Sequence, residues 1–332
     1  MAKARAIVKR RKAVRNIRKI TKTMQMIATA KFQKSLKRSV GTKAYTIKVR
    51  ELVTELASSG VQVKHPLLRR PGAEGDEPSN RAAVLVLTSN RGLAGAYNGS
   101  VLRAAMAHLR QLDAAGTAVD LYVSGKKGIS YFTFQKRPIA GRNDQQDPPR
   151  YADAERAAAK VMDQFAAGQL DAVYIVYMNF ISTGVQRPDV MTLLPLAGLR
   201  ESVERLARQV AEKEAQAKAG ALDARRRGDD VTVGPSHEGG LVPTTTYDFS
   251  PGADEILGEL LPLTVKTALW QAVLDAATSE HVARMVSMKS ATDNADKMAK
   301  ALTMQYNRAR QSQITTELSE IMGGVEAMKG KG

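Results

Sequence analysis

The residues best suited to do chemistry are cations gathered at the start of the chain. The first fifty residues hold seventeen Lys or Arg and no Asp or Glu, which equals the net charge of +17 for all 332 residues. Acids and bases therefore balance in the rest of the chain, so the charge is a local feature. Guanidinium and ammonium groups bind carboxylates and phosphates. The segment is predicted to work beside an acidic partner.

Side chains suited to catalysis or metal binding are sparse. The chain has no Cys, which excludes disulfides and thiolate metal sites. The four His lack metal-ligand spacing and are His65, His108, His237 and His281. Asp293 and Asn294 have no second acid or His at helical spacing, so we assign them no chemistry. We predict no catalytic site, no metal and no cofactor.

The glycines at 92, 95 and 99 follow an apolar segment at 82–88, an order that resembles a phosphate-binding turn after a strand. Their spacing does not match GxGxxG, and no GxxxxGK[ST] motif exists in the chain. We interpret these glycines as allowing a tight turn from strand to helix and close packing.

The cations must be positioned by long helices, and the sequence has two long helical patterns. Over residues 4–58 the apolar stripe includes Ile7, Val14, Ile17, Met24 and Ile27. A helix of fifty residues would reach about 75 Å, so it must pair with another helix or run inside a partner. Residues 263–328 carry a second stripe, typical of a loose coiled-coil seam, made of Leu269, Val273, Ala276, Val282, Met285, Met288, Ala291, Ala295, Met298 and Leu302.

Between the two helices the pattern changes to alternating strands and helices. Strands are predicted at 82–88, 119–123, 172–177 and 190–196, with helices at 94–112 and 151–165. The predicted fold is mixed α and β: an antiparallel coiled coil of the terminal helices with an inserted small Rossmann-like α/β domain. The domains are 1–60 (N-terminal coiled-coil helix), 80–250 (α/β domain) and 251–332 (C-terminal coiled-coil helix).

Four long blocks resemble one known family. They read RKITKTMQMIA at 18–28, SNRGLAGAYN at 89–98, EHVARMVSMKSATDNA at 280–295 and YNRARQSQITTE at 306–317. In this order they closely resemble the γ subunit of F-type ATP synthases, of the bacterial type. The resemblance implies a central rotor shaft that couples ion flow through the membrane ring to ATP synthesis or hydrolysis on the β subunits. Such a chain is a non-catalytic subunit of the enzyme complex.

The resemblance also implies partners and contact residues. The partners are the α and β subunits of the hexameric ring, the ε subunit and the membrane c-ring. Met24, Arg284, Gln311 and Thr315 match rotor positions that contact the ring, with Met24 packed near Arg284. A basic track would face an acidic lever of β and comprises Arg10, Arg11, Lys12, Arg15, Arg18, Lys19 and Lys22. For any single Lys, a solvated helix face is the competing interpretation.

One segment departs from the family pattern. Residues 198–243 form an insertion, with a predicted amphipathic helix at 201–222 and a loop at 228–246. Photosynthetic relatives carry a redox-regulated cysteine pair near this place, which cannot operate in a chain without Cys. We hypothesise that the insertion restrains rotation in the hydrolysis direction, or that it is a tolerated surface addition. Comparing hydrolysis and synthesis after its deletion decides between them.

Two further questions concern location and an alternative function. No apolar run approaches the roughly 20 residues of a membrane span. The expected location is peripheral, and the resemblance implies the cytoplasmic face of the bacterial inner membrane, with a processed organellar chain still open. The alternative function is a basic coiled coil that binds nucleic acid, which would bind DNA in a strongly salt-dependent way. That alternative does not explain the block at 306–317.

Overall fold

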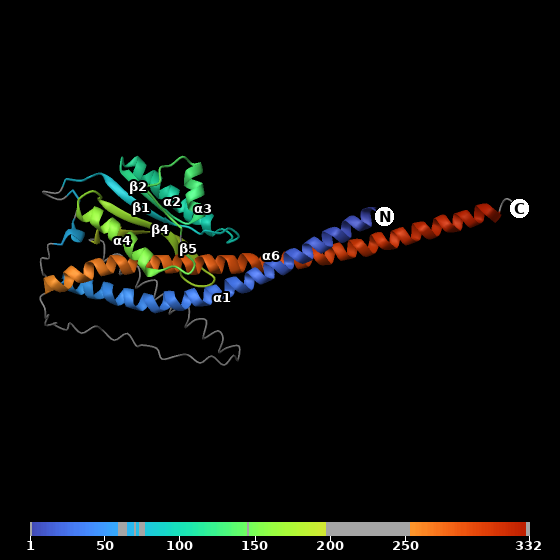
Figure 1. Cartoon of the computed structure of the whole chain (residues 1–332), viewed down its shortest axis with the longest axis horizontal. Coiled ribbons are helices and arrows are strands. Elements are labelled where there is room, and N and C mark those ends of the chain that lie inside the picture. The colour runs from blue at the N-terminus through green and yellow to red at the C-terminus, as the bar shows by residue number, and fades with distance from the viewer. Residues whose placement is uncertain are drawn as a thin grey trace, which may run out of the picture. The chain divides into compact units, whose positions relative to one another are not determined.

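Two long helices begin and end the described chain (Figure 1). The computed structural model describes residues 2–58, 65–69, 71–72, 77–144, 146–196 and 253–329. Helix α1 spans Ala2–Ser58 and helix α6 spans Ala253–Lys329, where the long helical patterns predicted them. Helix α6 begins ten residues before the apolar stripe predicted at 263–328, and Pro262 lies inside the helix. The insertion predicted at 198–243 lies entirely outside the described residues.

The chain divides into two compact units, each described by itself. The first contains Met1–Gln33, Leu93–Gly95 and His281–Gly332. The second contains Lys34–Gly92 and Ala96–Glu280. The basic start of α1 therefore belongs to the first unit, and the strands belong to the second.

The second unit is built on a five-stranded sheet in the order β3-β2-β1-β4-β5. Strand β1 pairs in parallel with both β2 and β4, and β2 pairs in parallel with β3. Strand β5 runs antiparallel to β4. The strands are β1 (Arg81–Leu87), β2 (Ala118–Ser124), β3 (Gly141–Asn143), β4 (Ala172–Phe180) and β5 (Gln186–Leu194). The sheet is thus mixed, as the pattern of short apolar segments predicted.

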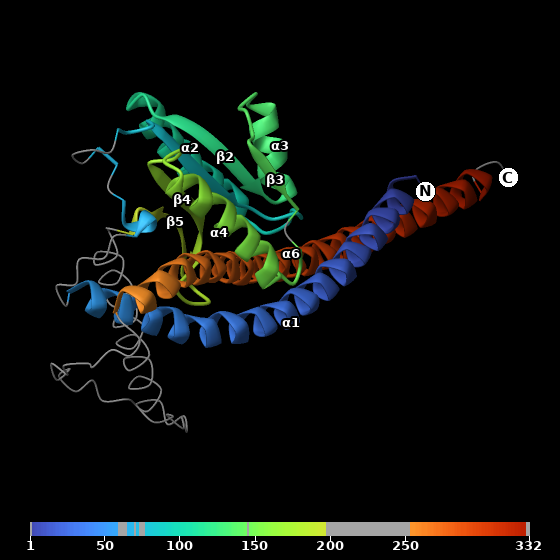
Figure 2. The same ribbon diagram turned by 60° about the vertical axis from the view of Figure 1, so that its left-hand side comes forward.

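Three connecting helices cover the two faces of this sheet. They are α2 (Tyr97–Ala114), α3 (Lys126–Phe134) and α4 (Tyr151–Ala166), and a short 3₁₀ helix, η1, spans Pro66–Leu68. The chain moves outward from β1 to β3 through α2 and α3, then returns to β4 through α4. Right-handed crossovers place α2 and α3 on one face and α4 on the other. Figure 2 shows α4 on the side of the sheet that faces α6.

The main core of the second unit lies between the sheet, α4 and the first turns of α6. Leu85 and Ile175 from the sheet, Phe165 from α4 and Leu269 from α6 are among its buried members. Burying a side chain of this size stabilises a fold by roughly 1.5–3 kcal/mol. The core therefore fixes α6 to the sheet within this unit.

The turn from β2 into α3 depends on glycine. Gly125 has a φ of 94°, and a Cβ there would lie 2.1 Å from the carbonyl oxygen of Thr88. At Gly128 a Cβ would lie 2.7 Å from Thr88 Oγ1. Residues without side chains let the chain pass this close to β1. Helix α3 and strand β3, which follow this turn, were not predicted from the sequence.

In the first unit, α1 and α6 run antiparallel. Arg18 forms an ion pair with Asp296, and the hydroxyl oxygens of Thr21 and Thr292 lie 2.8 Å apart. Residue numbers thus rise on one helix as they fall on the other. Gly95, in the turn after β1, has a φ of 54°. Its conformation agrees with the tight turn that we inferred for this glycine.

The residues that α1 buries in the first unit differ from part of the predicted stripe. Val14, Thr21 and Ala28 are buried and recur every seven residues. Ile17 and Ile27 were predicted in the stripe but are 52% and 53% exposed. A hydroxyl or a methyl side chain at the contact lets the two helices approach closely, which leaves the bulkier Ile side chains outside.

On α6 the buried positions of the first unit also recur every seven residues. Met288, Ala295 and Leu302 are buried, as the stripe predicted. Met298 was predicted in the same stripe but is 54% exposed. The contact line on α6 runs through Thr292, Ala295, Ala299 and Leu302 at spacings of three and four, and Met298 lies beside this line.

Candidate functional site

The basic track of α1 lies on the surface of the first unit. Arg10, Lys12, Arg15, Arg18, Lys19 and Lys22 are exposed, and Arg11 is half-buried. Helical geometry spreads these positions around α1, some beside α6 and others away from it. Because α1 holds no acid over this stretch, no carboxylate on its own helix neutralises the track.

Two cations of the track are engaged by α6. The Arg11 guanidinium lies 5.0 Å from the centre of the Tyr306 ring, and Arg18 pairs with Asp296. Both side chains of the ion pair are about half exposed, so the pair is worth about 1 kcal/mol or less. Tyr306 and Asp296 thus belong to the site, and the sequence did not identify them. Only the antiparallel register brings them beside these arginines.

A groove runs between the two helices next to this ion pair. It has a volume of about 520 Å³, and its lining includes Arg15, Lys19 and Lys300 together with the paired Arg18 and Asp296. Cations from both helices therefore gather at one place, although only those of α1 were predicted. Such a groove attracts acidic groups from solution and holds them weakly, because exposed ion pairs are screened by salt.

The four predicted contact positions lie on the first unit in two different environments. Met24 and Arg284 are half-buried, whereas Gln311 and Thr315 are exposed. The Thr315 hydroxyl donates a hydrogen bond of 3.0 Å to the backbone carbonyl of Gln311, one helical turn earlier. The Gln311 amide and the second lone pair of Thr315 Oγ1 face solvent and are available to a partner.

Sequence reasoning missed a buried polar cluster between α1 and α6 in the second unit. The Ser39 hydroxyl donates a hydrogen bond of 2.6 Å to Asp275 Oδ1. Gln271 Nε2 donates to the same carboxylate oxygen at 3.0 Å. Nearby, the hydroxyl oxygens of Ser35 and Thr278 lie 2.7 Å apart. We call these five residues the hydroxyl cluster. No signal in a single sequence distinguishes such residues from ordinary polar positions on a helix surface.

Groups able to do acid–base or metal chemistry do not gather in the described part of the chain. No group of three or more His, Asp or Glu residues there could hold a metal ion. Asp293 and Asn294 are exposed. Burial lowers the pKa of His108, whose ring centre lies 4.5 Å from that of Tyr174 in a T-shaped arrangement. Among the helices searched, none is long and apolar enough to cross a membrane.

Comparisons with known proteins find relatives along nearly the whole chain. The family model described as ATP synthase matches residues 3–328. The ATP synthase gamma chain of Rhodopirellula baltica is 41% identical over 331 residues, which cover 99% of this chain and 100% of that protein. The ATP synthase gamma chain of Gemmatimonas aurantiaca is 35% identical over 333 residues, covering 99% and 100%.

Solved structures show the same fold at lower sequence identity. A chain of the Euglena gracilis mitochondrial ATP synthase, in a structure of its OSCP, F1 and c-ring, has a TM-score of 0.58 and 18% identity. The likeness covers 98% of this chain and 95% of that chain. A chain of the rotor of the same enzyme gives a TM-score of 0.55 at 20% identity, covering 94% and 99%. Since sequence relatives match over their whole lengths, the chain described here belongs to the family of ATP synthase γ chains.

Proposed function

We propose that the chain is the central shaft of an F-type ATP synthase, which turns inside a ring of alternating α and β subunits. Its rotation couples ion flow through the membrane ring to ATP synthesis or hydrolysis on β. The observation that carries this function is the 41% identity to an ATP synthase gamma chain over 331 residues. The chain is a non-catalytic subunit, and the nucleotide chemistry belongs to β. It acts at the membrane as a peripheral protein, on the cytoplasmic face of a bacterial inner membrane.

We propose that α1 and α6 form an antiparallel coiled coil that carries the α/β domain. The seven-residue recurrence of Val14, Thr21 and Ala28 supports this, because that period matches a continuous seam between two helices. In this division residues 1–60 and 251–332 form the coiled coil. Residues 80–250 form the α/β domain, including the insertion at 198–243.

The basic track is proposed to guide rotation past acidic side chains of the β subunits. Arg18 and Arg11 have contacts on α6, so Arg15 and Lys19 in the groove are the track residues best placed to meet a partner. Each exposed ion pair between the basic track and β contributes only ~0–1 kcal/mol of interaction free energy. A set of such weak pairs can exchange partners as the shaft turns, whereas one strong pair would hold it at a single angle.

The contact positions Gln311 and Thr315 are proposed to hydrogen-bond a loop of β, together with Arg284. Both side chains are exposed on one face of α6, one turn apart, which supports a shared contact. Met24 is proposed to pack near Arg284 and hold its guanidinium in position. The directional bonds of an amide and a guanidinium can break and form again at each rotational step.

The first experiment is to purify a tagged copy of the full chain from its native membranes at low salt. We expect α and β subunits to be recovered with ATPase activity. Recovery of nucleic acid in their place would contradict the proposal and favour the basic coiled coil. Recovery of the chain by itself would contradict it too.

A charge variant then tests the basic track within the purified complex. Arg15→Gln/Lys19→Gln should change ATP hydrolysis by less than about fivefold at low salt, and the change should shrink as ionic strength rises. A matched variant, Arg103→Gln/Arg110→Gln, removes two exposed charges from α2 and should not show this salt dependence. An effect of the first variant that does not depend on salt would exclude an electrostatic role for the track.

A further inference from the structure

One acid lies among the cations of the groove between α1 and α6 in the first unit. Among the described residues that line this groove, Asp296 is the acid, and the cations are Arg15, Arg18, Lys19 and Lys300. The proposed partner of the basic track is itself acidic. Asp296 therefore opposes the binding that the groove is proposed to perform.

The Asp296 carboxylate pairs with the Arg18 guanidinium across the two helices. The side chains of Arg18 and Asp296 are 50% and 42% exposed, so either one can turn to a third group without a change in helix packing. Exposed ion pairs of this kind are weak, and they exchange with other charges in solution. Asp296 therefore holds Arg18 only while no other carboxylate competes for it.

Helical spacing brings Asp296 near the other cations of the groove as well. Lys300 follows Asp296 by four residues, so their side chains lie on the same side of α6. On α1, Arg15 precedes Arg18 by three residues and shares its side of the helix. A carboxylate that enters the groove thus meets the cations as opposite charges and Asp296 as a like charge at short range.

We propose that Asp296 is an internal competitor for Arg18, and so a positioning residue of the basic track. It pairs with Arg18 while no acid of a partner is in the groove, and it gives up Arg18 when an acidic side chain of β enters. The groove then binds each passing acid more weakly than four uncontested cations would, so the shaft is released sooner. This inference rests on the proposed rotor function, because it needs acids that pass the groove one after another.

The first test measures the groove in the full-length chain without other subunits. The probe is a fluorescein-labelled hexaglutamate peptide, and its anisotropy gives the Kd at low salt. Asp296→Asn should lower this Kd at least about twofold, since the change removes a like charge and frees Arg18. Asp293→Asn is the matched control, because Asp293 is exposed on the same helix and does not line the groove. Equal changes in the two variants would mean that net charge alone matters, which would refute the proposal.

Two further variants test whether Asp296 acts through Arg18 and through its charge. In an Arg18→Gln background, Asp296→Asn should change the Kd less than it does in the parent chain, because no guanidinium is released. Asp296→Glu keeps the carboxylate and should bind the peptide as the parent does. An equal effect of Asp296→Asn in both backgrounds would overturn the proposal. An Asp296→Glu chain that binds like Asp296→Asn would overturn it too.

The second test measures ATP hydrolysis by the purified complex with α and β subunits. The Asp296→Asn complex should hydrolyse ATP at least about twofold more slowly than the parent complex at low salt, because the acids of β leave the groove more slowly. The difference should disappear at high ionic strength, where exposed charges are screened. Hydrolysis that is unchanged or faster at low salt would contradict a role for Asp296 in release.

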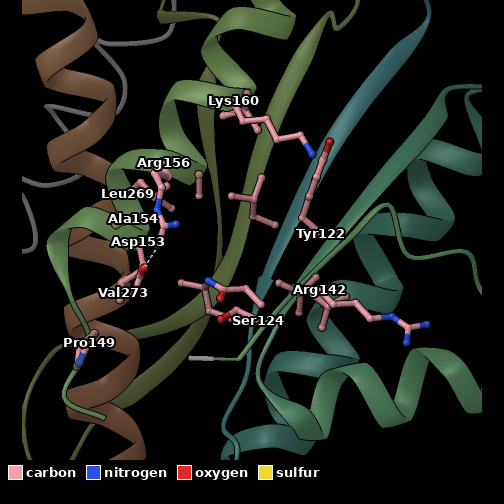
Figure 3. Close-up of a pocket in the computed structure, with 18 of the residues that line it drawn as sticks. Tyr122, Ser124, Arg142, Pro149, Asp153, Ala154, Arg156, Lys160, Leu269 and Val273 are labelled. Atoms are coloured by element: carbon pink, nitrogen blue, oxygen red, sulfur yellow. Dashed lines mark hydrogen bonds and ion pairs between the residues drawn. The ribbon is translucent and has the colours of Figure 1, made fainter. Parts of the chain in front are cut away.

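The second unit supplies a control with the same combination of charges (Figure 3). Asp153 pairs with Arg156 on α4, beside a cavity that is also lined by the exposed cations Arg142, Arg150 and Lys160. This pair lies within one helix of the α/β domain and outside the basic track. Asp153→Asn should therefore leave ATP hydrolysis and its salt dependence as in the parent complex. Equal slowing by Asp153→Asn and Asp296→Asn would refute a special role for the groove.

The rotor function and the role of Asp296 fail in different ways. Recovery of the parent chain without α and β subunits would contradict the rotor function. Equal peptide binding by Asp296→Asn and Asp293→Asn would refute the competition for Arg18 and would not affect the rotor function, because the peptide measurement involves no other subunit.

Discussion

Replacing Ser39 with Ala tests whether the hydroxyl cluster holds α1 to α6. Ser39 and Asp275 are 3% and 4% exposed, and the Ser39 hydroxyl donates to the Asp275 carboxylate at 2.6 Å. Removing this donor leaves a buried carboxylate with one hydrogen bond fewer. A hydrogen bond to a charged group contributes about 1.5–3 kcal/mol. Ala is the better helix former, by about 0.5 kcal/mol. We expect the free energy of unfolding to fall by about 1–2.5 kcal/mol.

The geometry of the cluster also predicts how a second change combines with the first. Gln271 Nε2 donates both to Ser39 Oγ, at 3.2 Å, and to Asp275 Oδ1, at 3.0 Å. The three side chains therefore act as a unit. In a double-mutant cycle of Ser39→Ala with Asp275→Asn, we expect a coupling energy of about 0.5–3 kcal/mol. Additive effects would mean that the two groups do not interact.

Urea unfolding of the full-length chain, followed by circular dichroism, provides the measurement. Hydrogen exchange of the amides at 271–279 shows whether the loss is local. Ser290→Ala on the exposed surface of α6 is the matched control, and its effect should stay within about 0.5 kcal/mol. If Ser39→Ala is no more destabilising than Ser290→Ala, the hydroxyl cluster does not stabilise the helix pair.

Three further changes test other parts of the second unit. Gly125→Ala places a Cβ at 2.1 Å from the Thr88 carbonyl oxygen and should destabilise the chain by at least about 3 kcal/mol, measured by urea unfolding. The hydrogen bond from Arg137 lowers the pKa of Asp113, so Asp113→Asn should lower stability by up to about 1 kcal/mol at pH 7, an effect that disappears as the pH falls below about 4. Burial lowers the pKa of His108, so the unfolded chain takes up this proton first as the pH falls below about 6.5, and His108→Phe should reduce the acid destabilisation in that range.

Each of these changes has a control or a contrary outcome. Gly184 has no atom within 4 Å of the position where a Cβ would lie, so Gly184→Ala should be nearly neutral. Equal effects at Gly125 and Gly184 would mean that the turn can move aside. A difference between Asp113→Asn and the parent chain that persists at pH 2 would exclude the ion pair as its cause. If the free energy of unfolding of His108→Phe and that of the parent chain changed with pH in the same way, His108 would not contribute to the acid destabilisation.

The long helices and most of the sheet followed from the sequence because their patterns are long or strongly apolar. Strand β3 could not be predicted, since Gly141–Asn143 has no apolar residue and exists through its pairing with β2. Helix α3 carries Ile129, Tyr131 and Phe132 in nine residues, a composition equally typical of a strand. Contacts with the rest of the fold, and not the local sequence pattern, determine both elements.

The sequence predicted less of the contact between α1 and α6 than of the helices themselves. The rule that apolar residues are buried predicted Ile17 and Ile27 at the contact between the helices. The structure buries Thr21 and Ala28 there. Thr21 is buried where the Thr292 hydroxyl meets it, and Thr292 is more than 250 positions away in the chain. The contacts of Arg11 with Tyr306 and of Arg18 with Asp296 could not be predicted for the same reason. Pairing of this kind depends on how α1 and α6 are aligned along each other, and a single sequence does not give that alignment.

The acid-free start of α1 has a consequence for the order in which the molecule is made. Arg11, Arg15 and Lys19 follow one another at intervals of four, so each repels the next along the helix by about 0.2–0.5 kcal/mol. Tyr306 and Asp296, which meet this stretch, are synthesised more than 270 residues later than the arginines that they contact. This stretch of α1 must therefore wait until α6 has been synthesised before it gains its partners. We expect amides at 5–20 to exchange rapidly in a chain truncated before residue 281 and slowly in the full chain, and equal rates would contradict this order.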